Sequence, residues 1–134
     1  MSVQRRETLE IRTSEDVVKV RQLAREWAVS SGFRLVEQTK LVTAASEIAR
    51  NVLQYGGGGS VALEVLEEDA RRGLRLSFED EGPGIPEIEL ALKDGFSSGG
   101  GLGLGLGGAR RLVHEFALES KVGVGTRVRL TQWK

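Results

Sequence analysis

The sequence contains no cysteine and only one histidine, His114, among its 134 residues. Without thiols the chain has no disulfide, no thiolate nucleophile and no cysteine metal site. A single histidine also makes a zinc site built from histidines improbable. Thiol chemistry and zinc chemistry are therefore not expected.

Net charge and long apolar runs are missing as well. The 19 Lys and Arg residues balance the 19 Asp and Glu residues, so bulk charge attracts the chain neither to nucleic acid nor to an anionic membrane. No stretch approaches the roughly 20 apolar residues of a membrane helix, and residues 1–12 lack the apolar region of a signal peptide. We expect a soluble cytoplasmic protein without nucleic-acid or membrane partners, folded as one domain over residues 1–134.

Glycine, in contrast, is abundant. The chain has 18 glycines, and most gather in two clusters, at residues 56–59 and 99–108. Such clusters indicate backbone conformations, or a close approach of the backbone to a ligand, that side chains would block.

The spacing of apolar residues predicts both helices and strands. Ser14, followed by Glu15 and Asp16, is the expected N-cap of the first helix. The predicted helices cover residues 14–30, 35–55, 87–93 and 106–116. The predicted strands cover residues 8–12, 60–66, 74–78, 118–122 and 127–130, and residues 94–105 are predicted as a loop. We expect an α+β fold in which helices cover one face of a mostly antiparallel sheet.

Glu47 and Asn51 lie four positions apart in the predicted helix 35–55, so they stack on one helix face. Their stripe runs beside the apolar positions Ala44, Ile48 and Val52. A carboxylate and an amide thus lie at the rim of the core, where a cavity between helix and sheet can open. A solvated helix edge is the alternative for this pair taken alone.

A turn with two glycines follows the apolar strand at residues 74–78. Its sequence, Asp80-Glu81-Gly82-Pro83-Gly84-Ile85, permits a tight turn of unusual φ. The Asp80 carboxylate only accepts hydrogen bonds, so it suits an exocyclic amine such as that of adenine. An ordinary structural turn is the alternative.

The second glycine cluster precedes the predicted helix 106–116. Backbone N–H groups and a helix N-terminus there can bind phosphate oxygens. Gly103-x-Gly105-x-x-Gly108 matches the dinucleotide fingerprint, but a polar, glycine-rich stretch replaces the apolar strand that this motif requires, and the sequence has no Walker motif. A flexible linker is the alternative.

Several basic and aromatic residues allow two interpretations. Arg110 and Arg111 lie within two helical turns of the glycine loop, and Arg50 lies beside Asn51. Any of the three could contact a γ-phosphate, or all could be solvated. His114 is expected on a solvated helix side, and Trp133 either at the core edge or on a contact surface.

Four motifs, in order, resemble those of the GHKL ATPase/kinase superfamily. Residues 46–51, Ser-Glu-Ile-Ala-Arg-Asn, resemble the N box, and residues 80–85 resemble the G1 box. Residues 101–105 resemble the G2 box, and Gly123-x-Gly125-Thr126 resembles the G3 element. Residues 94–98 and 111–116 further resemble the RsbT-type serine/threonine protein kinases, the switch kinases of bacterial stressosomes. The resemblance covers about residues 35–130.

This resemblance implies a Bergerat fold, a two-layer α/β sandwich with ATP between the helices and the sheet. It implies that Asp80 binds the adenine amine, with help through water from Thr126 and the Gly84 backbone. Asn51 would ligate Mg²⁺ and Glu47 would act as general base. Residues 86–99 would form the ATP lid. The full set of implied binding residues is Asn51, Asp80, Gly82, Gly84, Ile85, Gly100, Gly101, Leu102, Gly103, Leu104, Gly105 and Thr126.

The same resemblance implies an ATP-dependent serine/threonine protein kinase of stress-response signalling. Its substrates would be STAS-domain scaffold proteins, and after release it would bind and activate a PP2C-type phosphatase. One alternative is an anti-sigma factor with serine kinase activity; another is a non-catalytic protein-binding module that retains the fold. Intact Glu47, Asn51 and Asp80 argue against the second, because a decayed site has no physical need for all three.

Overall fold

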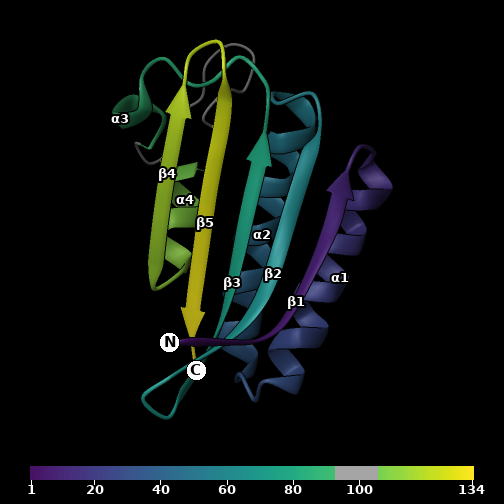
Figure 1. Cartoon of the computed structure of the whole chain (residues 1–134), viewed down its shortest axis with the longest axis vertical. Coiled ribbons are helices and arrows are strands. Elements are labelled where there is room, and N and C mark those ends of the chain that lie inside the picture. Colours follow the sequence, from purple (N-terminus) through teal and green to yellow (C-terminus); the bar gives the residue numbers. More distant parts are fainter. Residues whose placement is uncertain (93–105) are drawn as a thin grey trace.

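The computed structural model describes residues 1–92 and 106–134, so the predicted loop at residues 94–105 lies outside the described part. The elements follow one another along the chain as Figure 1 shows. Their order is β1 (Ser2–Ile11), α1 (Ser14–Ser30), α2 (Leu35–Gln54), β2 (Gly59–Glu68), β3 (Arg71–Asp80), α3 (Ile88–Ala91), α4 (Leu106–Leu112), β4 (Glu115–Lys121) and β5 (Gly125–Trp133).

The strands form one antiparallel sheet in the order β1-β2-β3-β5-β4. β2 and β3 form a hairpin, which turns at Asp69 and Ala70 with φ angles of 48° and 67°. Two successive left-handed residues are the geometry of a tight two-residue hairpin turn. β5 then pairs with β3 and sets Thr126 opposite Asp80. The end of β3 and the start of β5 therefore meet at one end of the sheet, at the top of Figure 1.

α1 begins with a capping box. The Thr13 hydroxyl accepts the Asp16 N–H at 3.2 Å, and the Asp16 carboxylate accepts the N–H groups of Arg12 and Thr13 at 2.8 and 3.1 Å. These bonds satisfy N–H groups that a helix start would otherwise leave free. The N-cap is therefore Thr13, one residue before the predicted Ser14.

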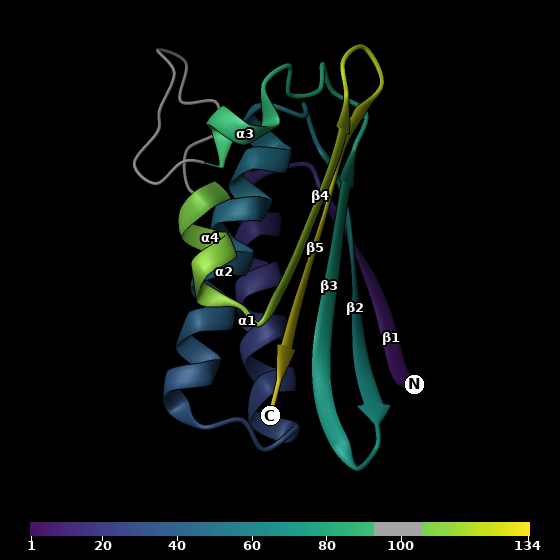
Figure 2. The same ribbon diagram turned by 90° about the vertical axis from the view of Figure 1, so that its left-hand side faces the viewer.

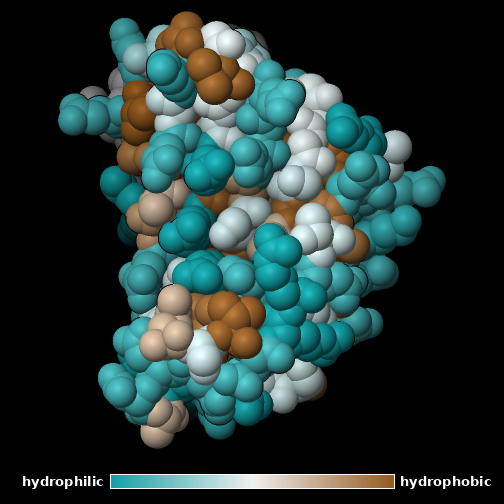
Figure 3. Space-filling view, viewed as in Figure 1, coloured by the Kyte–Doolittle hydropathy of each residue, from teal (hydrophilic) through white to brown (hydrophobic). Residues whose placement is uncertain are grey.

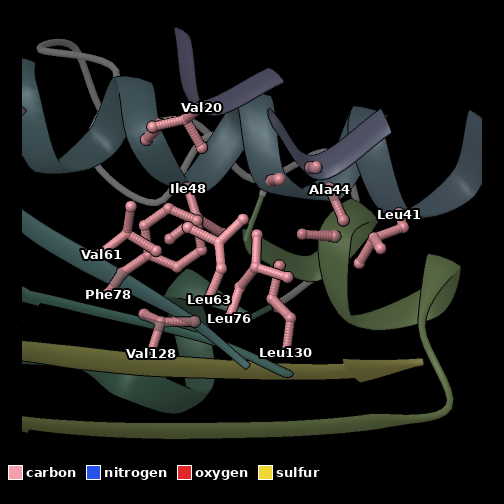
Figure 4. Packing of buried hydrophobic residues seen from close by; sticks show 14 of the residues in the cluster. Val20, Leu41, Ala44, Ile48, Val61, Leu63, Leu76, Phe78, Val128 and Leu130 are labelled. Atoms are coloured by element: carbon pink, nitrogen blue, oxygen red, sulfur yellow. The ribbon is translucent and has the colours of Figure 1, made fainter. Parts of the chain in front are cut away.

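α2 carries the apolar stripe that the sequence predicts. Burial of each larger aliphatic side chain contributes roughly 1.5–3 kcal/mol to folding. Figure 4 shows Ile48 of α2 directed toward Phe78 of the sheet. The predicted core positions of this helix are all buried, namely Leu41, Ala44, Ala45, Ile48 and Val52.

The described helices lie on one side of the sheet (Figure 2). The opposite face of the sheet is largely hydrophilic, with separate small apolar groups (Figure 3). The predicted two-layer α+β sandwich, with helices on one face of an antiparallel sheet, is confirmed. None of the helices within residues 1–92 and 106–134 is long and apolar enough to cross a membrane.

The helix predicted over residues 106–116 is too long. α4 ends at Leu112, and β4 begins at Glu115. The His114 N–H donates to Oε1 of Gln132 at 2.9 Å, and Nδ1 of His114 accepts the Trp133 N–H at 2.9 Å. These bonds fix the chain beside β5, so His114 lies between α4 and β4 and not on a helix face.

β1 is longer than the predicted strand at residues 8–12. It pairs with β2 from Ser2 onward, with a bulge between Val3 and Arg5. The side chains of residues 2–8 are all exposed. This half of the strand buries neither face, so its sequence lacks the alternation of apolar and polar residues that would predict a strand.

Candidate functional site

Asp80 ends β3 in a tightly defined setting. Its Oδ1 accepts the Gly82 N–H at 2.9 Å, and the Thr126 N–H also donates to the carboxylate. Gly56, just after α2, lies directly beside it, because a Cβ on residue 56 would come 2.4 Å from the Asp80 Cγ. Two backbone donors and a neighbour without a side chain thus fix the carboxylate.

The charge of Asp80 is only partly compensated. Burial raises the pKa of the Asp80 carboxyl above its ordinary value, and hydrogen bonds from Gly82 and Thr126 offset part of that rise. The neighbouring Glu79 adds a further upward shift by repulsion. A half-buried carboxylate of this kind gains from one more hydrogen-bond donor, and it can only accept. The position therefore suits a ligand that presents an N–H group.

Asp80 lines a pocket between α2 and the sheet. Five predicted site residues line it together, namely Asn51, Asp80, Gly84, Ile85 and Thr126. The rest of the wall is mostly apolar and consists of Ile48, Val52, Tyr55, Gly56, Phe78, Pro83, Leu106 and Val128. Mostly apolar walls that include the Asp80 acceptor suit a flat heterocycle that carries an amine.

The turn after β3 packs against the β4–β5 hairpin. Gly84 has φ +79°, and a Cβ there would lie 2.5 Å from the carbonyl oxygen of Lys121. The Ile85 N–H donates to Oγ of Ser120 at 2.7 Å. Only glycine meets both demands at position 84, the left-handed backbone and the close approach.

α2 brings Asn51 to the pocket and Glu47 close to it. Asn51 is part of the wall, whereas Glu47, one turn earlier, is half-buried and outside the wall formed by the described residues. Oε1 of Glu47 lies 3.2 Å from Nη2 of Arg50, which also lies 3.2 Å from Oγ of Ser46. A half-exposed pair such as this one contributes less than about 1 kcal/mol to stability.

The predicted binding residues Gly100, Gly101, Leu102, Gly103, Leu104 and Gly105 lie outside the described residues. Leu106, the first residue of α4, is buried and contributes to the pocket wall. Arg110 and Arg111 are exposed near the end of this helix. The predicted phosphate loop therefore connects directly to an element that lines the pocket.

Two contributors to the site are absent from the sequence prediction. Gly56 belongs to a glycine cluster that indicated special backbone conformations or a close approach to a ligand, but not a contact with Asp80; its N–H donates to the Asn51 carbonyl at 3.2 Å after the end of α2, and it makes room for the Asp80 carboxylate. The signal was a run of four glycines where one suffices to stop a helix. Ser120 gives no sequence signal, because one serine in a strand is ordinary.

Trp133 belongs to the packed part of the molecule. It is 8% exposed, its indole N–H donates to Glu115, and the Arg71 guanidinium lies 4.0 Å from the ring centroid. A Cβ on Gly73 would lie 2.6 Å from the ring. Trp133 therefore covers Gly73, at the end of β5 away from the pocket.

Comparison with known proteins agrees with this fold. Residues 36–134 match the family described as histidine kinase-, DNA gyrase B- and HSP90-like ATPase. The chain is 45% identical over 123 residues to the serine/threonine-protein kinase RsbT of Bacillus subtilis, and this match covers 92% of each chain. It is also 34% identical over 101 residues to the anti-sigma F factor of Geobacillus stearothermophilus, a match that covers 70% of this chain and 68% of that protein. The crystal structure of the RsbU and RsbW domains of Rv1364c from Mycobacterium tuberculosis aligns with a TM-score of 0.66 at 23% identity, over 98% of this chain and 33% of that one.

The chain therefore belongs to the histidine kinase-, DNA gyrase B- and HSP90-like ATPase family. The predicted GHKL fold is confirmed. Within the family, the predicted kinship with RsbT-type kinases is confirmed too, and the chain is an ATP-dependent enzyme of the serine/threonine protein kinase type.

Proposed function

We propose that residues 1–134 act as one kinase domain that binds ATP in the pocket at Asp80. Its γ-phosphate is transferred to a serine or threonine of a STAS-domain scaffold protein. The observation that carries the proposal is the position of Asp80, an acceptor fixed by Gly82, Thr126 and Gly56 at the end of an apolar pocket.

Adenine suits the pocket because its faces are apolar and its edge carries an amine. Its flat ring packs between Ile48 of α2 and Val128 of β5, both of which line the pocket. Its amine donates to the Asp80 carboxylate, and Thr126 with the Gly84 backbone assists through water. Burial of the Asp80 carboxyl, which raises its pKa, supports this assignment, because a hydrogen bond donated by the ligand would offset part of the cost of burying the charge.

The two side chains proposed to serve phosphotransfer, Asn51 and Glu47, both lie on α2. Asn51 offers an amide oxygen at the pocket wall, a ligand type that suits Mg²⁺, which takes few protein ligands beside phosphates and water. Bound Mg²⁺ would neutralise charge on the phosphates during transfer. Glu47 accepts the proton of the attacking hydroxyl, whose oxygen bonds to the γ-phosphorus as the bond to the ADP oxygen breaks.

The relatives support a role in which the kinase exchanges protein partners, because the chain is similar to RsbT and to an anti-sigma factor. On this proposal, scaffold phosphorylation releases the kinase to bind and activate a PP2C-type phosphatase in stress signalling in the cytoplasm. The identity and coverage of the match to RsbT favour this role over sigma-factor binding.

The test is incubation of the purified chain with γ-labelled ATP, Mg²⁺ and a candidate STAS-domain scaffold. Label on the scaffold, absent when its acceptor serine or threonine is replaced by alanine, is the expected result. A pull-down that uses this chain as bait, from a lysate of the cells that express it, should recover the scaffold and a PP2C-type phosphatase. Recovery of a sigma subunit in their place would support the anti-sigma alternative, and an unlabelled scaffold set would contradict the substrate proposal.

A further inference from the structure

Ser120 lies where three segments of the proposed adenine wall meet. It belongs to β4, and its Oγ accepts the Ile85 N–H at 2.7 Å. The same oxygen lies 2.9 Å from Oγ1 of Thr126 and 3.2 Å from the Gly125 carbonyl oxygen. Ser120 thus joins the turn after β3 to the beginning of β5.

These contacts fix the direction of the hydroxyl hydrogens. A serine hydroxyl has one donor and two acceptor sites. The Ile85 N–H fills one acceptor site, and the Gly125 carbonyl can only accept, so the Ser120 hydrogen goes to Gly125. All three contacts are then satisfied together only if Thr126 donates its hydrogen to Ser120. The Thr126 oxygen consequently keeps acceptor capacity alone for the pocket that it lines.

We infer that Ser120 is a positioning residue that gives the site its preference for an amino-purine over an oxo-purine. This inference rests on the proposed ATP site. With Thr126 bound to Ser120, the 6-position of the base faces two acceptors, the Asp80 carboxylate directly and the Thr126 oxygen through the bridging water. Adenine presents an amine at its 6-position, whereas guanine presents a carbonyl oxygen there. Two acceptors therefore bind the first and repel the second.

Ser120 also supports the wall itself. Ile85 is 8% exposed, so loss of the serine oxygen would leave its N–H unsatisfied in a largely buried position. Without Ser120, the Thr126 hydroxyl is free to rotate and to present its hydrogen to the base. Rotation weakens the selection against a carbonyl oxygen while it leaves Asn51 and Glu47 untouched.

The direct test compares Ser120→Ala with a matched control, Ser77→Ala. Ser77 is half-buried in β3 of the same sheet, and it is not among the pocket-lining residues. Calorimetry with Mg-ATP and Mg-GTP should show about tenfold weaker ATP binding for Ser120→Ala, with GTP binding changed less than twofold, as expected for one lost neutral hydrogen bond. Ser77→Ala should keep both affinities.

The ratio of the two affinities separates positioning from a structural role. Equal losses for ATP and GTP, or an unchanged ATP affinity, would overturn the inference while leaving the ATP site in place. Absence of ATP binding by the unaltered protein would instead overturn the proposed function. If Ser120→Ala does not fold, Ser120→Cys, whose thiol is a weaker hydrogen-bonding group, carries the same comparison.

A double-mutant cycle tests whether Ser120 acts through Thr126. In a Thr126→Val background, Ser120→Ala should lower ATP affinity less than twofold further, because the interaction is already lost. A further tenfold loss in that background would show that Ser120 acts independently of Thr126 and would contradict the inference.

Discussion

Gly56 and Asp80 are in such close contact that a Cβ on residue 56 would lie 2.4 Å from the Asp80 Cγ. The first residue ends a helix, and the second ends a strand on the opposite layer. The position of the Asp80 acceptor therefore depends on the way α2 terminates, and the backbone at residue 56 is part of the proposed nucleotide site.

Gly56→Ala should displace the Asp80 carboxylate. Overpacking of this kind costs about 1–3 kcal/mol of unfolding free energy, and loss of the aligned acceptor should weaken ATP binding at least about tenfold. Urea unfolding and calorimetry measure the two effects.

Gly108→Ala is the matched control for that experiment. A Cβ on this exposed residue of α4 meets nothing within 4 Å, and alanine stabilises a helix by about 0.5–1 kcal/mol over glycine. Its free energy of unfolding should rise. If Gly56→Ala retains normal ATP affinity, the close fit at Asp80 has no role in binding.

At neutral pH the ionised Asp80 carboxylate should lower the free energy of unfolding of the ligand-free protein. Because the folded-state pKa of Asp80 is raised, its protonated form favours the fold, and that contribution is lost as pH rises through the folded pKa. Asp80→Asn cannot ionise, so at pH 7 it should melt at a temperature equal to or above that of the unaltered protein. The difference should vanish below the ordinary pKa of 3.8, and thermal melts across this range measure it. A variant that melts lower at pH 7 and gains relative stability on acidification would show the opposite sign.

Glu47→Gln should separate nucleotide binding from phosphotransfer. The amide keeps the size of the side chain but cannot accept the proton of the attacking hydroxyl, so Mg-ATP affinity should change little while transfer falls at least about hundredfold. Glu26→Gln, an exposed carboxylate change on α1, is the control. Normal transfer by Glu47→Gln in a labelling assay would remove Glu47 as general base.

The buried parts of the fold and the acceptor at Asp80 follow from the sequence. The stripe around Ile48 has helical spacing, and the strand that ends at Asp80 alternates cleanly, since each element buries one face. The exposed start of β1 has no such pattern. Residues 113–116 continue the helical spacing, but α4 ends before them because hydrogen bonds between His114 and residues 132 and 133 of β5, which are distant in sequence, decide its end.

The residues of the site also fall into those that the sequence predicts and those that it does not. Asn51, Asp80, Gly84, Ile85 and Thr126 carry motif signals and meet in one pocket. The contributions of Gly56 and Ser120 depend on contacts between elements, which spacing along one element does not encode. Sequence therefore predicts the groups that would contact the ligand better than those that position them.

The most direct test of the central claim is calorimetric titration of the unaltered protein and of Asp80→Asn with Mg-ATP. If Asp80 accepts a hydrogen bond from the adenine amine, the substitution removes a charge-assisted bond of about 1.5–3 kcal/mol, which is about ten- to hundredfold in affinity. If this assignment is correct, the unaltered protein binds Mg-ATP tightly and Asp80→Asn shows a loss of that size. Equal ATP affinity for the two proteins would contradict it.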